Sequence, residues 1–158
     1  MTNNVDINII VAVSNPPPVS FETTLQIRDH CLCLAAQRAA RALARRFDEA
    51  LRPVGLTSGQ FSLLMSLNRP KAPTIGMVAE TLAMDRTTLT ANLKPLERRG
   101  LIEVTVDPQD RRGRRLSLTD EGMTVLAAAT PIWTAEHARL DETLADGKAL
   151  RAGLRVLA

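Results

Sequence analysis

The stretch DRTTLTANLKPLERRGLIEVTVDPQDRRGRRLSLT, residues 85–119, predicts a polar helix followed directly by a short hairpin. Asp85 is placed to cap the helix start by accepting a backbone N–H bond, and Gly100 is placed to end it in a left-handed conformation. Leucines repeat at helical spacing between these two ends and give the helix one apolar stripe. They are Leu89, Leu93 and Leu96. The rest of the helix surface is therefore expected to be exposed and polar.

That exposed surface combines short hydroxyls, an amide and cations. Thr and Asn side chains can bond base edges or phosphates in the major groove of DNA, and Arg and Lys neutralise the backbone. The helix is therefore predicted to contact double-stranded DNA, with Pro95 expected to kink it or leave a slack turn near 91–95. The predicted contact residues are Arg86, Thr87, Thr88, Thr90, Ala91, Asn92 and Lys94.

The hairpin supports DNA binding independently. Apolar and polar residues alternate in 102–106 and 116–118, so each strand has one face to bury. Its tip carries Arg111, Arg112, Arg114 and Arg115, and four crowded guanidinium groups are best explained by a polyanionic partner. The first three are predicted DNA contacts. Two acidic residues, Asp107 and Asp110, are expected to pair with arginines and shape the tip.

These motifs resemble the winged helix-turn-helix of the MarR family of bacterial transcription regulators. The resemblance rests on helix 74–83, helix 85–99, the wing DPQDRRGRR, the exit LSLTDEG and the preceding segment GLTSGQFSLLMSL. It covers roughly residues 25–158. It implies a mostly α fold with a small β-hairpin wing, in which 53–119 form the DNA-binding domain and 21–52 and 120–158 form a helical dimerisation region.

The terminal regions support a dimer from their own pattern. No Pro or Gly interrupts the helical pattern from Ser20 or Glu22 to about Leu51, and a helix of about thirty residues spans about 45 Å. Such a helix needs a partner. A second helical pattern runs from Asp120 to about Ala145 with a kink expected at Pro131, and a short helix follows. Terminal helices on both sides of a compact DNA-binding domain imply a two-fold homodimer. Its two DNA-binding domains would lie about 34 Å apart on a palindromic operator.

Composition agrees with a small DNA-binding protein. The chain has 158 residues, 45% of them hydrophobic, and a net charge of +3. Residues 85–115 contain eight basic and five acidic side chains, so their excess equals that of the whole chain. No apolar run reaches the roughly 18 residues of a membrane span, and the N-terminus lacks the basic start of a signal peptide. With two cysteines and no export signal, we expect a cytoplasmic location and no membrane partner.

Residues 1–20 form a tail outside the resemblance. Apolar residues alternate with others over 5–13, before three prolines at 16–18, which predicts a strand. A lone strand is unstable in water, so it would pair with the wing, pair with its copy in a second subunit, or remain disordered. Pairing in a dimer is favoured over disorder.

Two cysteines, Cys31 and Cys33, are candidates for a redox switch. On a continuous helix they point about 200° apart, which excludes an internal disulfide unless the helix unwinds. Cys33 is placed similarly to the sensing cysteine of the hydroperoxide-responsive branch of the family, but that branch activates its thiol with tyrosines and this chain has none. A structural role is therefore favoured over sensing. Neither a metal site nor a cofactor is expected, because His30, Cys31 and Cys33 cannot converge on one helix.

The resemblance also implies a small-molecule effector pocket between the dimerisation helices and the reader. The candidate lining residues are His30, Gln37, Arg41, Met65, Trp133 and His137. A core role is the commoner explanation of Met and Trp at helical spacing. The identity of the effector does not follow from the sequence.

The sequence therefore predicts a homodimeric, sequence-specific DNA-binding transcription regulator, a repressor released by an effector. One alternative is a redox-sensing regulator acting through Cys33, and another is a helical protein-interaction module that binds no specific DNA. A thiol enzyme would need a base and a substrate cleft that the sequence does not provide, so no enzymatic activity is predicted. The first interpretation is preferred because it alone uses the polar helix and the arginine-rich tip together.

Overall fold

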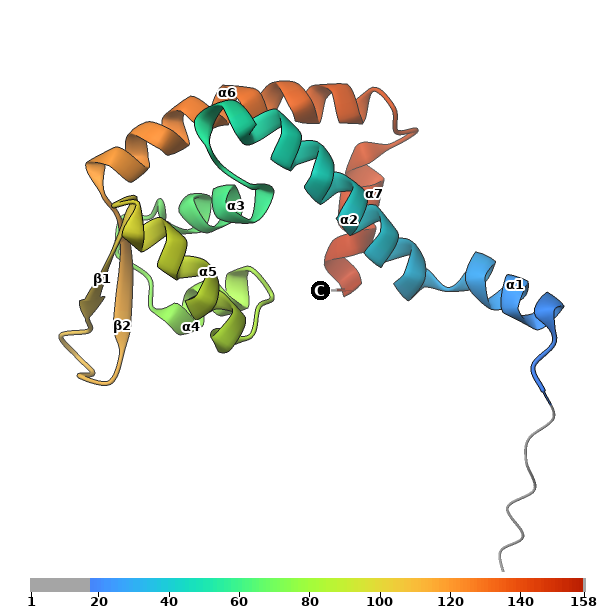
Figure 1. The fold of residues 1–158 in the computed structure, drawn as a ribbon, viewed down its shortest axis with the longest axis horizontal. Helices are drawn as coiled ribbons and strands as arrows, with labels where there is room; N and C mark the ends of the chain where they lie inside the picture. The colour runs from blue at the N-terminus through green and yellow to red at the C-terminus, as the bar shows by residue number, and fades with distance from the viewer. Residues whose placement is uncertain (1–17, 158) are drawn as a thin grey trace, which may run out of the picture. The chain divides into compact units, whose positions relative to one another are not determined.

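A computed structural model describes residues 18–157 of the chain, so the strand predicted over residues 5–13 lies outside the described residues. The chain divides into two compact units, one ending at Arg38 and one beginning at Ala39, and each is described by itself (Figure 1). The architecture is mostly helical with one antiparallel two-stranded sheet, as the sequence predicts.

The N-terminal unit contains helix α1 (Phe21–His30) and the start of helix α2 (Leu32–Leu51). The prediction of one continuous helix up to Leu51 is wrong, because Cys31 lies between the two with extended φ and ψ of −75° and 101°. Its thiol accepts the backbone N–H of Leu34 at 3.3 Å, and its carbonyl accepts that of Ala35. Cys31 thus caps α2, a role that usually falls to Ser, Thr, Asp or Asn.

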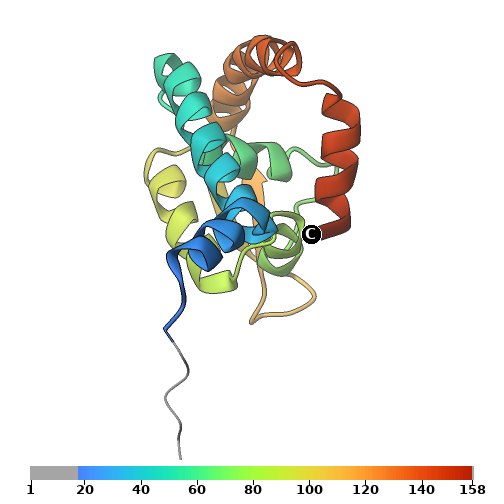
Figure 2. The ribbon, with the colours of Figure 1, turned by 90° about the vertical axis from the view of Figure 1, so that its right-hand side faces the viewer.

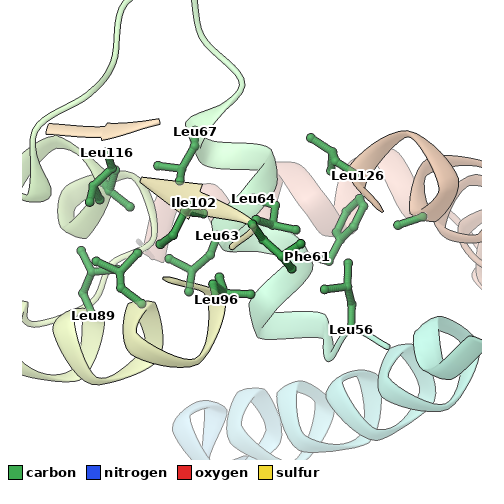
Figure 3. Packing of buried hydrophobic residues seen from close by; sticks show 14 of the residues in the cluster. Leu56, Phe61, Leu63, Leu64, Leu67, Leu89, Leu96, Ile102, Leu116 and Leu126 are labelled. Atoms are coloured by element: carbon green, nitrogen blue, oxygen red, sulfur yellow. The ribbon is translucent and has the colours of Figure 1, made fainter. Parts of the chain in front are cut away.

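The core of the second unit is organised around helix α3 (Ser58–Leu67). A capping box of Thr57 and Gln60 fixes its start, after a 3₁₀ turn at Arg52–Val54. Figure 3 shows Leu63 and Leu64 of α3 in the middle of the apolar cluster, between side chains of other elements. Those other side chains include Leu89, Leu96, Ile102, Leu116 and Leu126.

Helices α4 (Ile75–Thr81) and α5 (Arg86–Arg98) precede strands β1 (Ile102–Val106) and β2 (Arg114–Leu118), which project as a hairpin beside them (Figure 1). The predicted cap is confirmed, since Asp85 accepts the N–H of Thr88 at 2.8 Å, and Gly100 has a φ of 69°. The three predicted leucines of α5 are buried. The helix continues through Pro95, so the slack turn predicted there does not form.

Helix α6 (Asp120–Asp141) starts at the cap residue Thr119 and continues through Pro131 without a break. It ends four residues before the predicted Ala145, and helix α7 (Gly147–Leu157) then turns back from its end (Figure 2). Arg151 of α7 donates to Asp141 of α6 at 2.7 Å, which holds the two helices together. No helix in residues 18–157 combines the length and the apolar character needed to cross a membrane.

Candidate nucleic-acid interface

Helix α5 presents a continuous polar face on the side opposite its buried leucines. Five exposed residues line a single hollow of about 390 Å³ on this face. They are Arg86, Thr87, Thr90, Ala91 and Lys94. At about 100° per residue they occupy about 140° of the helix circumference, which matches a surface that enters a groove edge-on. We call these five residues the reading face.

Thr88 and Asn92, which were also predicted as DNA contacts, lie outside the reading face. Thr88 donates its hydroxyl to Asp85 at 2.6 Å, and this bond is the main reason that the pKa of the Asp85 carboxyl lies below its usual range. Asn92 lies about 170° around the helix from the centre of the reading face. Its amide is 3.9 Å from the sulfur of Met84. The sequence prediction assigned DNA contact to residues all around the helix outside the leucine stripe. Thr88 and Asn92 are the two helix residues among them that do not lie on the reading face.

The base of the wing is fixed by a buried carboxylate. Asp107 accepts the backbone N–H of Gln109 at 3.0 Å and the Arg115 Nε at 3.1 Å. Both contacts lower the pKa of the Asp107 carboxyl, the backbone bond most strongly. Arg115 also donates to the carbonyl of Ala72 at 2.9 Å. Arg115 therefore attaches the wing to the loop before α4.

At the tip of the wing, two arginine side chains among the described residues have no polar partner. Asp110 accepts the backbone N–H of Arg112 at 2.9 Å, and the Arg114 guanidinium donates to the carbonyl oxygens of Arg111 and Gly113. Within residues 18–157, the side chains of Arg111 and Arg112 make no ion pair or hydrogen bond. Both guanidinium groups are free to bind an anion.

A second hollow, of about 470 Å³, joins the reading face to the wing. Arg86 and Thr90 of the reading face belong to it, and so do Arg112 and Arg114 of the wing. Thr74 and Gly76 at the start of α4 also line it, and the sequence prediction missed both. Thr74 was recognisable as a helix cap, since its side chain accepts the N–H of Met77. The candidate interface is therefore one polar surface built from α4, α5 and the wing.

A separate cavity of about 350 Å³ lies among α2, α3 and α6. Aromatic rings dominate it: the ring centroids of Trp133 and His137 are 4.0 Å apart, and those of Phe47 and His137 are 4.5 Å apart. Phe61 stacks on Trp133 at 6.1 Å. The remaining lining residues are Ala40, Leu43, Ala44, Leu51, Ser58 and Ser62. We call this space the aromatic cavity.

The structure brings only some of the predicted pocket residues together. Trp133 and His137 line the aromatic cavity, and Met65 lines an adjoining hollow of about 500 Å³ that shares Trp133. Arg41 lines neither of these two spaces. His30 and Gln37 belong to the N-terminal unit. The prediction did not include Phe47 and Phe61, which also line the aromatic cavity.

The two cysteines differ in exposure. Cys33 is exposed, and its sulfur accepts the side-chain N–H of Gln37 at 3.2 Å, whereas Cys31 is half-buried at the break between α1 and α2. Because α2 begins after Cys31, the premise that both cysteines lie on one helix does not hold. In residues 18–157, the structure places no three His, Cys, Asp or Glu side chains where they could hold a metal ion together.

A buried carboxylate connects the two long helices beside the aromatic cavity. Glu136 of α6 binds Arg46 of α2 and accepts from Arg139 at 3.1 Å. The bond from Arg46 is the main reason that the pKa of the Glu136 carboxyl lies below its usual range. The ion pair therefore favours the charged form of Glu136 in the folded protein.

Acid is expected to weaken this connection. A carboxyl whose pKa is lowered by folding adds stability above its unfolded pKa of about 4.3 and loses it as the pH falls through its folded value. The free energy of unfolding should therefore decrease as the pH is lowered below about 5. This decrease should be less steep in Glu136→Gln than in the wild type. Urea unfolding between pH 3.5 and 7 measures this slope. Glu80→Gln, at an exposed carboxylate, is the control, and equal slopes in all three proteins would contradict the prediction.

The helix pair α4–α5 followed by a two-stranded wing defines a winged helix-turn-helix protein. The MarR family model matches residues 56–113. The transcriptional regulator MosR of Mycobacterium tuberculosis, solved in complex with DNA, is 36% identical with a TM-score of 0.76, and the match covers 81% of this chain and 93% of MosR. The chain belongs to the MarR family of transcription regulators.

Two further relatives agree. The transcriptional repressor CouR, solved with p-coumaroyl-CoA, is 32% identical with a TM-score of 0.73, and the match covers 83% of this chain and 94% of CouR. The regulator SarZ of Staphylococcus epidermidis is 28% identical over 94 residues, which are 60% of this chain. The match spans 64% of the length of SarZ. These relatives are transcription regulators, not enzymes.

Proposed function

We propose that the protein is a homodimeric, sequence-specific regulator that binds double-stranded DNA and acts as a repressor released by a small molecule. The observation that carries the proposal is the continuity of the reading face with Arg112 and Arg114 of the wing. The reading face offers hydroxyls and cations to a major groove, while Arg111 and Arg112 extend to the flanking backbone or minor groove. The DNA complexes of MosR and CouR support this placement. Such a regulator works in the cytoplasm, beside the bacterial chromosome.

Exposed apolar side chains on the terminal helices support the homodimer. Leu150 and Leu154 of α7 are each nearly half exposed, and Leu157 is 62% exposed. Phe21 and Ile27 of α1 are more than half exposed. Contiguous apolar surface on a terminal helix marks an interface, and a two-fold axis would set two reading faces one DNA turn apart on a palindromic operator.

The aromatic cavity is the proposed effector site. Helix α3 forms one wall of the cavity, and its Leu63 lies in the same apolar cluster as Leu89 and Leu96 of α5, the helix that carries the reading face (Figure 3). A ligand bound between α3 and α6 would shift α3. Because the packed core has few alternative arrangements, a shift of α3 would be passed on to α5. The complex of CouR with p-coumaroyl-CoA supports a ligand-controlled regulator.

Thiol oxidation at Cys33 is the second candidate for control. Its exposure favours access by an oxidant, and the Gln37 amide is the neighbour that donates to its sulfur. We favour control by a small molecule over thiol oxidation. The aromatic cavity offers a binding site, and helix α3 in its wall belongs to the same apolar core as α5. A protein-interaction module without specific DNA binding would show little dependence of affinity on salt.

Selection from a pool of random duplexes, with and without peroxide, tests the proposed function. Recovery of a palindrome with half-sites about one turn apart supports a dimeric specific regulator. Loss of binding after peroxide treatment, and its retention in Cys33→Ser, would assign control to the thiol. Failure to recover any motif would contradict sequence-specific binding.

Two substitutions on α5 test the reading face. Thr87→Ala should relax base preference at one position per half-site by about 1–3 kcal/mol, because Thr87 lies on the reading face. Asn92→Ala is the matched control and should leave base preference unchanged, since Asn92 lies on the other side of the helix. Binding to an operator and to its single-base variants measures both effects. A larger loss of preference in Asn92→Ala would contradict the assigned face.

A further inference from the structure

Gly76, in the first turn of α4, leaves room for the side chain of Arg86. A β-carbon added at Gly76 would lie 3.2 Å from Nη2 and 3.9 Å from Cζ of the Arg86 guanidinium. The φ of Gly76 is not in the left-handed region, and glycine is one of the poorest helix formers. The glycine is therefore explained by the space that it leaves beside α4, and the Arg86 guanidinium lies against that space.

The guanidinium of Arg86 has no polar partner in the part of the chain that the structure describes. Among residues 18–157 it makes neither an ion pair nor a hydrogen bond. A guanidinium carries five N–H donors in a planar fork, which matches the oxygens of a phosphate or a carboxylate. Arg86 therefore lies close to α4 and keeps its donors available for an external anion.

Positive charge prevails in the hollow of about 470 Å³ that joins α5 to the wing. Its charged lining residues are Arg86, Arg112, Arg114, Asp107 and Asp110. Asp107 is paired at 3.1 Å with Arg115, which does not line the hollow. The other carboxylate, Asp110, accepts the backbone N–H of Arg112 at 2.9 Å. Three guanidinium groups thus face one carboxylate that has no arginine of its own outside the hollow.

Arg86 lies at one edge of the reading face. At about 100° per residue, the other four members follow it in one direction around the helix, and the nearest of them is Thr90. Arg86 and Thr90 are also the members that line the hollow beside the wing. In a helix-turn-helix the first helix crosses the DNA backbone while the second enters the groove. A side chain that leaves α5 toward α4, the first helix, therefore points to the backbone.

We infer that Arg86 binds a phosphate of the DNA backbone, and that Gly76 is the positioning residue that lets it lie there. A larger side chain at Gly76 would occupy the space beside α4 and displace the guanidinium from the hollow. The inference rests on the proposed function and deepens it, because it divides the reading face into two parts. Arg86 forms a phosphate-binding edge, and Thr87 belongs to the part that reads bases.

Substitutions at the two positions should have the same effect on DNA binding. Arg86→Ala and Gly76→Leu are each expected to weaken the selected operator about three- to tenfold at 0.1 M salt, and to make the salt slope shallower by about one per subunit. Gly76→Ala should cause a smaller loss, because its β-carbon displaces only the end of a flexible side chain. Fluorescence anisotropy measures affinity and slope. Unchanged affinity and slope in Gly76→Leu would overturn the positioning role.

Stability and the double variant separate positioning from a structural role. Alanine and leucine favour a helix over glycine, so the thermal midpoints of Gly76→Ala and Gly76→Leu should stay the same or rise while affinity falls. Adding Gly76→Leu to Arg86→Ala should cause no further loss of affinity, because the displaced group is already absent. A further loss would show that leucine itself blocks the DNA and would contradict the inference.

Operators with a single methylphosphonate, which removes one backbone charge at a time, identify the contact. At one position per half-site the substitution should weaken the wild type but not Arg86→Ala or Gly76→Leu. Thr87→Ala, which removes no charge, is the control and should remain sensitive at that position. A relaxed base preference in Arg86→Ala, with no such phosphate, would mean that Arg86 reads a base and would overturn the inference.

The wild type distinguishes failure of this inference from failure of the proposed function. If the wild type selects no operator, the proposed function fails, and the inference fails with it. If the wild type binds a selected operator and the variants at Gly76 and Arg86 bind it equally well, only the inference fails.

Discussion

Replacing Gly122 with alanine is expected to destabilise the protein by about 3 kcal/mol or more. A β-carbon at this position would lie 1.9 Å from the carbonyl oxygen of Leu101, a backbone atom that cannot move aside alone. Two hydrogen bonds hold the close approach: the Thr119 N–H donates to the Leu101 carbonyl at 3.2 Å, and the Thr119 hydroxyl donates to the Gly100 carbonyl at 2.6 Å. The first turn of α6 would have to move away from Leu101, the residue before β1.

Thermal unfolding at fixed protein concentration measures the effect. The midpoint of Gly122→Ala should fall by about 6–12 °C, given a shift of about 2–4 °C per kcal/mol for a chain of this size. Gly59→Ala is the matched control, because nothing lies within 4 Å of the added β-carbon and alanine favours the helix. Its midpoint should stay the same or rise. An unchanged midpoint for Gly122→Ala would contradict the close packing of α6 on the backbone of Leu101.

The sequence was sufficient for the elements whose signals are local. The cap at Asp85, the left-handed Gly100 and the three leucines of α5 each follow from chemistry within a few residues. The alternation of the wing likewise predicted the observed strands and their antiparallel pairing. Each of these features depends on periodicity or local backbone conformation, and both can be inferred from neighbouring residues in the sequence.

Other features depend on contacts between distant residues. Asn92 is polar and exposed in both the prediction and the structure, and the helical repeat alone turns it away from Thr87, but only the packed structure shows that the hollows beside the wing lie on the Thr87 side. Phe47 and Phe61 have the spacing of core residues, and their role in a cavity emerges when α2, α3 and α6 are packed together. The break at Cys31 was missed because cysteine is a rare helix cap.

Removing the two wing-tip arginines whose guanidinium groups have no partner among the described residues should cause the largest loss of DNA affinity. Arg111→Ala combined with Arg112→Ala is expected to weaken binding to every duplex by about 10- to 100-fold at 0.1 M salt, because each guanidinium neutralises about one phosphate. The loss should be nearly independent of sequence, since the proposed function assigns phosphate and groove contacts to these side chains and base contacts to the reading face of α5. Arg115 is excluded from the test, because Asp107 and Ala72 hold it in the structure.

The dependence of affinity on salt identifies the mechanism. The slope of log affinity against log salt should become shallower by about two per subunit in the double variant, one for each lost phosphate contact. Arg45→Ala is the charge control: Arg45 is an exposed arginine of α2 outside the reading face and the wing, and its loss should leave the slope unchanged. Fluorescence anisotropy with the selected operator and a scrambled duplex between 50 and about 300 mM salt measures both quantities. A loss confined to the operator would mean that the wing reads sequence, and an unchanged slope would mean that the wing does not contact phosphate.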